Sequence, residues 1–170
     1  LSNRTIDSKK YIMLNGSNTR SVKLKIIDDN DYQIFDNGRI RIETNIFDSN
    51  DYTDSQFKVS RISKYITKYF SDNSDLNLLV SKSDYYENPY YGLNQLPNFL
   101  SPFSDKYLEE IIFLKAFIKN YLDEKILLNK RKSNWVYKGI EIFLIDKYIK
   151  EYYPKVRFLG RISGYNFLKK

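Results

Sequence analysis

The chain has 170 residues, of which 42% are hydrophobic and 29% charged; this is enough for one domain with a hydrophobic core, and no apolar run is long enough to cross a membrane. It contains no histidine and no cysteine, which excludes disulfides, Ser-His and Cys-His nucleophile pairs, and the imidazole and thiolate sites that zinc, copper and iron favour. The net charge is +7, but acidic residues alternate with basic ones, without the basic patch typical of nucleic-acid binding.

The N-terminal part of the sequence predicts short strands. Apolar or alternating residues favour strands at 11–14, 22–26, 34–35 and 40–42. The last two flank the segment Asp36-Asn37-Gly38, and Asn-Gly tolerates the positive φ of a tight turn. We therefore expect a hairpin at this position.

A helix, a strand and a long loop should follow. Asp54 is the expected N-cap of a helix whose apolar residues run from Phe57 to Phe70 and which ends near Asn73. Residues 76–80 predict a buried strand. Residues 83–104 contain three prolines and many aromatic residues, which predicts a long loop that either packs onto the core or contacts a ligand or partner.

Two helices are expected in the C-terminal part. The first should run from Asp105 to Leu122 with Ser104 as its cap, and the second from about Ser133 to about Tyr153, before Pro154. The order of elements predicts an α+β fold. We expect one domain, with a strand-rich lobe and one helix over 1–83, the loop over 84–104 and a helical lobe over 105–170. Because the sequence begins at Leu1 without methionine, we expect it to be part of a longer protein.

The two C-terminal helices carry a spacing that resembles a known family. The segment Lys115-Ala116-Phe117-Ile118-Lys119 is followed, after an eighteen-residue gap, by Lys138 within Trp135-Val136-Tyr137-Lys138-Gly139-Ile140. This resembles the gluzincin metallopeptidases of the aminopeptidase N type, in which H-E-x-x-H on one helix is followed by a glutamate ligand in a context like W-x-x-E-G. The segment Tyr91-Gly92-Leu93-Asn94-Gln95-Leu96-Pro97 resembles their substrate-binding loop. Residues 129–160 are similar to envelope-associated members from Bacteroidetes.

The resemblance implies a thermolysin-like fold in which every catalytic position has been replaced. Lys115 and Lys119 stand at the histidine positions, Ala116 at the general-base glutamate, and Lys138 at the glutamate ligand. Gln95 stands where the family's loop has its amine-binding glutamate. Ammonium groups repel a divalent cation, so the resemblance implies a pseudoenzyme with no metal and no cofactor.

The helical spacing places Lys115 and Lys119 on an apolar face of the first helix, and Lys138 on an apolar face of the second. Glu141, one turn beyond Lys138, is a candidate partner for that lysine. The lysines either extend to solvent without a role or form a cationic pocket for an acidic group. Tyr91, Gly92 and Gln95 complete the candidate binding residues.

We therefore expect an inactive, aminopeptidase-like module that binds a protein or peptide, or acts as a scaffold, within a larger protein of the cell envelope. Two alternatives remain open. One is a zinc metallopeptidase domain, as the fold alone would suggest, and the other is a basic module that binds an anionic polymer.

Overall fold

The computed structural model of the chain describes residues 2–6, 9–13, 32–48, 51–70, 75–90, 103–126 and 130–154. The chain divides into two compact units, Leu1–Asn30 and Asp31–Lys170, whereas the sequence predicted one domain. In the first unit, β1 (Ser2–Ile6) pairs antiparallel with β2 (Lys9–Met13). The strand predicted at 11–14 thus overlaps β2, and the one predicted at 22–26 lies outside the described residues.

The second unit begins with a three-stranded sheet whose strand order is β3-β4-β5. Strands β3 (Gln33–Asp36) and β4 (Ile40–Thr44) form the predicted antiparallel hairpin. Gly38 adopts a positive φ of 82° in its turn, which glycine allows without a steric penalty. The side chain of Asn37 accepts hydrogen bonds from the backbone N–H groups of Arg39 and Ile40 at 3.1 and 2.8 Å, and this fixes the turn.

Helix α1 (Tyr52–Phe70) connects β4 to β5 (Leu76–Val80), which pairs parallel with β4. The predicted N-cap, Asp54, was wrong because this residue lies inside the first turn. Its backbone N–H donates to the Asp51 carboxylate at 3.2 Å, so Asp51 caps the helix. Phe57 was also expected on the apolar face, but its side chain is 62% exposed.

The segment predicted as a long loop contains a short helix. Helix α2 (Lys82–Tyr86) begins directly after β5, with Ser81 and Asp84 forming a capping box. Residues 91–102, which include much of the predicted loop, lie outside the described residues. The loop prediction therefore failed at its beginning because the capping signal at Ser81 was overlooked.

Two long helices complete the unit. Helix α3 (Asp105–Lys125) begins at the predicted cap, where the Ser104 side chain accepts a hydrogen bond from the backbone of Tyr107, and it continues one turn beyond the predicted end. Helix α4 (Lys130–Tyr152) begins before Ser133, but Ser133 has non-helical φ and ψ of −120° and 23°. The predicted start therefore coincides with a kink in the observed helix.

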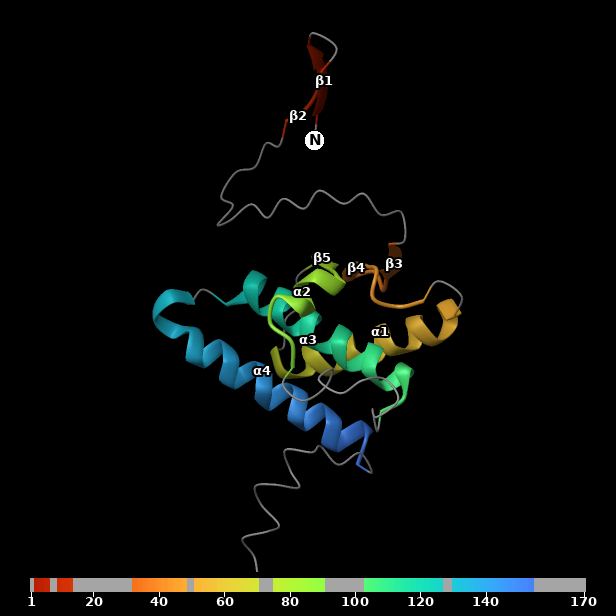
Figure 1. The fold of residues 1–170 in the computed structure, drawn as a ribbon, viewed down its shortest axis with the longest axis vertical. Coiled ribbons are helices and arrows are strands. Elements are labelled where there is room, and N and C mark those ends of the chain that lie inside the picture. The colour runs from red at the N-terminus through yellow and green to blue at the C-terminus, as the bar shows by residue number, and fades with distance from the viewer. Residues whose placement is uncertain are drawn as a thin grey trace, which may run out of the picture. The chain divides into compact units, whose positions relative to one another are not determined.

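Helix α3 is central to the second unit, because it contacts β5, α1, α2 and α4. Figure 1 shows the sheet on one side of the helices and α4 on the outer side. The hydrophobic core contains side chains from all these layers, including Ile42, Ile62, Leu78, Phe117 and Ile145. The unit is thus α+β, as predicted. Among the described helices, none combines the length and the apolar character that crossing a bilayer requires.

Candidate functional site

Lys115 lies in the middle of α3, on the face that packs against α4. Only 3% of its surface is exposed, because the apolar residues around it draw this face of the helix into the core. Its ammonium group forms an ion pair and a hydrogen bond with the carboxylate of Glu141 on α4. Burial lowers the pKa of Lys115, the neighbouring charges of Lys138 and Lys119 act in the same direction, and Glu141 opposes them.

Glu141 is shared by two lysines. The ammonium group of Lys138, one turn earlier on α4, lies 3.6 Å from the second carboxylate oxygen of Glu141. The predicted pairing of Lys138 with Glu141 is therefore present. The closer contact of Glu141, however, is with Lys115 across the helix interface, and the sequence did not predict it.

Lys119 has a different partner. Its ammonium group forms an ion pair with Glu87, in the turn after α2. The structure thus brings Lys115 and Lys138 together around one carboxylate and directs Lys119 to another. Ala116 is completely buried beside them. The remaining predicted binding residues, Tyr91, Gly92 and Gln95, lie outside the described residues.

The side chains at this site do not fit a divalent metal ion. The positions that hold the metal ligands and the general base in the resembled family carry three lysines and Ala116. Neither an ammonium group nor a methyl group can donate a lone pair to a metal. Within the described ranges, no three His, Cys, Asp or Glu residues come together in a way that could hold a metal. The lysines instead form ion pairs with Glu141 and Glu87.

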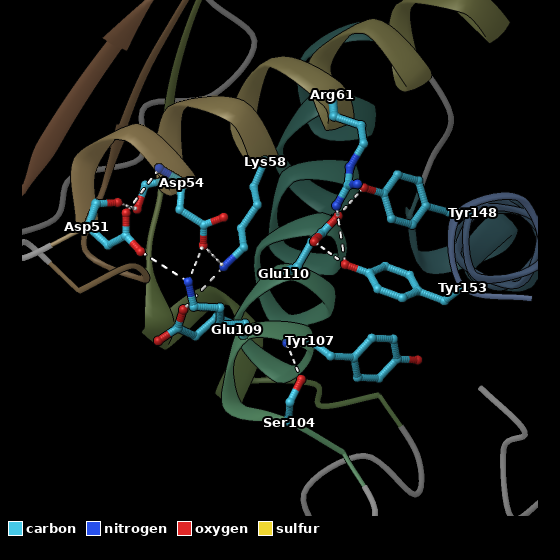
Figure 2. A network of polar contacts seen from close by, with 12 residues as sticks. Asp51, Asp54, Lys58, Arg61, Ser104, Tyr107, Glu109, Glu110, Tyr148 and Tyr153 are labelled. Atoms are coloured by element: carbon cyan, nitrogen blue, oxygen red, sulfur yellow. Dashed lines mark hydrogen bonds and ion pairs between the residues drawn. The ribbon is translucent and has the colours of Figure 1, made fainter. Parts of the chain in front are cut away.

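A second buried polar cluster joins α1, α3 and α4, and the sequence analysis did not predict it. Figure 2 shows the Glu110 carboxylate of α3 facing Arg61 of α1 and the hydroxyl groups of Tyr148 of α4 and of Tyr153, the residue after that helix. Glu110 has no exposed surface. Burial and the adjacent Glu110 charge raise the pKa of both tyrosines, so their hydroxyls remain protonated and donate to the carboxylate.

One feature of the sequence could have revealed this cluster. Glu110 occurs three residues after Tyr107 and four before Leu114, both of which are buried, so it lies on the apolar face of α3. A carboxylate at such a position needs charged or hydrogen-bonding partners. Its partners could not be identified from sequence, since Arg61 and Tyr148 come from distant segments.

A more exposed ion-pair group lies beside this cluster, also visible in Figure 2. The Lys58 ammonium of α1 is 2.8 Å from Asp54 and 3.6 Å from Glu109 of α3. Lys106 lies 3.1 Å from Asp51, the residue that caps α1. These pairs connect the start of α1 to the start of α3.

Comparison of the chain with protein-family models, with curated proteins and with solved structures finds no match.

Proposed function

We propose that this chain is a catalytically inactive module of the aminopeptidase N type, with a thermolysin-like fold, which binds a partner or acts as a scaffold within a larger cell-envelope protein. The observation that carries the proposal is the buried ion pair between Lys115 and Glu141. Lys115 stands where the H-E-x-x-H motif of the resembled family has its first histidine ligand. A cation at this position repels zinc and already occupies the nearby carboxylate of Glu141.

Loss of the general base supports the same conclusion. The position between the two metal-binding residues of the motif is Ala116, whose methyl group cannot accept a proton from water. Hydrolysis by a metallopeptidase needs both a metal and a group that activates water. Neither requirement is met by the residues at these positions.

The geometry of the two helices supports the proposed ancestry. Ligands of one metal ion must converge on one point from different elements. Lys115 of α3 and Lys138 of α4 converge on a single carboxylate, that of Glu141. Two positions that would contribute ligands in the resembled family therefore lie close enough to share a partner.

The outer face of α4 supports a protein or peptide as the partner. Trp135, Ile142 and Phe143 are 77%, 53% and 57% exposed. Exposed aromatic and aliphatic side chains on one element are typical of protein interfaces. An anionic polymer would instead need available cations, and Lys115 and Lys119 already have carboxylate partners.

Restoring the family's residues tests the proposal. The wild-type chain, incubated with zinc and then dialysed, should retain no stoichiometric metal. The variant carrying Lys115→His, Ala116→Glu, Lys119→His and Lys138→Glu should bind one zinc ion. A matched variant that keeps Lys138 should bind zinc more weakly, because it lacks one of three protein ligands.

Two results would contradict the proposal. Stoichiometric zinc in the wild-type chain, together with chelator-sensitive cleavage of aminoacyl reporter substrates, would indicate an active peptidase. A folded fourfold variant without zinc affinity would show that the four positions do not converge as metal ligands, and the inferred ancestry would be wrong.

A further inference from the structure

A hollow of about 270 Å³ lies between α1 and the end of α4, away from the Lys115–Glu141 pair. Phe57, Ser60, Arg61 and Lys64 line it from one face of α1, since they are three or four residues apart, and Tyr152 lines it from α4. The hollow thus combines two cations, two hydroxyl groups and two aromatic rings.

Arg61 is held in a fixed position at this hollow. Its Nη2 donates to Glu110 and, at 3.2 Å, to the hydroxyl of Tyr153. The guanidinium carbon also lies 5.2 Å from the ring centres of both Phe57 and Tyr152, within the range of cation–π attraction. These contacts fix the guanidinium group before any ligand binds, which reduces the entropy lost on binding.

The guanidinium group retains unused donors. Its Nε is buried and has no acceptor within the part of the chain that the structure describes. Nη1 likewise has no acceptor among those residues, because both hydrogen bonds of Arg61 use Nη2. Because Nε is closed to solvent, the N–H groups of Nη1 are the donors that remain for an anion in the hollow.

Both charged side chains that line the hollow directly, Arg61 and Lys64, are cations. Lys64 is exposed, and it forms no ion pair with any described residue. Glu110 neutralises one positive charge from beneath Arg61, and the charge of Glu151 raises the pKa of Tyr152 on the α4 side. Among the lining side chains, Lys64 is the cation without a carboxylate partner in the described residues. The exposed ring of Phe57 and the half-buried ring of Tyr152 add apolar walls beside the cations.

We propose that this hollow binds a small ligand in which a carboxylate or phosphate group is attached to an aromatic or other apolar group. The anion contacts Arg61 and Lys64, and the apolar group packs against Phe57 and Tyr152. Ser60, on the same face of α1, supplies a hydroxyl group that can donate to the anion.

Titration of the full chain with phenyl phosphate, phenylacetate and benzyl alcohol, followed by NMR, tests this site. Both anions should bind saturably, with a dissociation constant on the order of 1 mM. Lys64→Ala and Phe57→Ala, both at exposed positions, should each weaken binding about tenfold. The matched control Lys68→Ala, also exposed on α1, should bind like the wild type. The anion that binds more tightly identifies the ligand as a carboxylate or a phosphate.

Three results would overturn the proposal. The first is absence of saturable binding by either anion to the folded chain. The second is equal binding of benzyl alcohol, which would show that the cations contribute nothing. The third is equal weakening by Lys68→Ala, which would indicate general attraction to a basic protein.

Discussion

Lys115 and Glu141 form one ion pair but do not depend on it equally, and this asymmetry predicts which partner the fold can lose more easily. Glu141 has a second cation, Lys138, at 3.6 Å. Lys115 has no second carboxylate among the described residues. Substituting each partner by methionine, which has a similar length, should therefore give different losses of stability.

The magnitudes follow from burial and distance. Lys115 is 3% exposed and Glu141 is 7% exposed, and a buried ion left without its partner costs about 3–5 kcal/mol. Glu141→Met should cost this amount, because it leaves Lys115 buried and unpaired. Lys115→Met should cost about 1–3 kcal/mol, since Lys138 still attracts Glu141. The double variant should be close to the wild type, because no uncompensated charge remains.

Urea denaturation of the wild type, the two single variants and the double variant measures these values. Lys138→Met is a suitable control and should cost less than about 1 kcal/mol, because its side chain is partly exposed. Equal losses for both single variants would refute the argument from the second cation. Additive losses in the double variant would show that the two residues do not interact.

Three further outcomes are expected. Burial raises the pKa of Tyr85 to about 12, whereas the unfolded state loses this proton from about pH 10. The free energy of unfolding, measured in urea, should therefore fall as the pH rises from about 10 to about 12, and a constant value would contradict this. Ser104→Ala should reduce the free energy of unfolding by about 1 kcal/mol, measured in urea, because the side chain caps α3; no loss would contradict this role. In the same assay, Phe117→Ala should cost about 3–5 kcal/mol, because Phe117 is fully buried. Trp135→Ala should cost less than about 0.5 kcal/mol, because Trp135 is 77% exposed. Similar losses for the two variants would show that Trp135 contributes to the core.

Local patterns were sufficient to predict much of the second unit. The Asn37-Gly38 turn, the strand at 76–80 and the start of α3 at Ser104 depend on neighbours in sequence, and all three are present. The α1 cap was misplaced by three residues because Asp51 and Asp54 are both good capping residues. Only the backbone geometry shows that Asp51 accepts the bond.

The contacts of the candidate site could be predicted only within one helix. The Lys138–Glu141 pair spans one turn of α4, so helical spacing was enough to find it. The pairs of Lys115 with Glu141 and of Lys119 with Glu87 join residues from different elements. Spacing along the sequence says nothing about the register between two helices, and that register decides these contacts.

The buried polar groups themselves offer a reason for that register. Glu110 of α3 meets Tyr148 of α4, while Lys115, further along α3, meets Glu141, which comes earlier on α4. The two contacts thus run in opposite directions along the helices, as an antiparallel pair requires. A slip of one turn would displace α4 by about 5.4 Å, and the buried Leu144, Ile145 and Ile149 of α4 would still find apolar neighbours. Lys115, however, would lose Glu141 and be left buried without a partner, at a cost of about 3–5 kcal/mol. Glu110 would keep Arg61 of α1 but lose the hydroxyl group of Tyr148, at a cost of about 1.5–3 kcal/mol. We infer that the apolar residues drive the association of α3 with α4, and that the two buried carboxylates select one register from several that the apolar surfaces alone would accept.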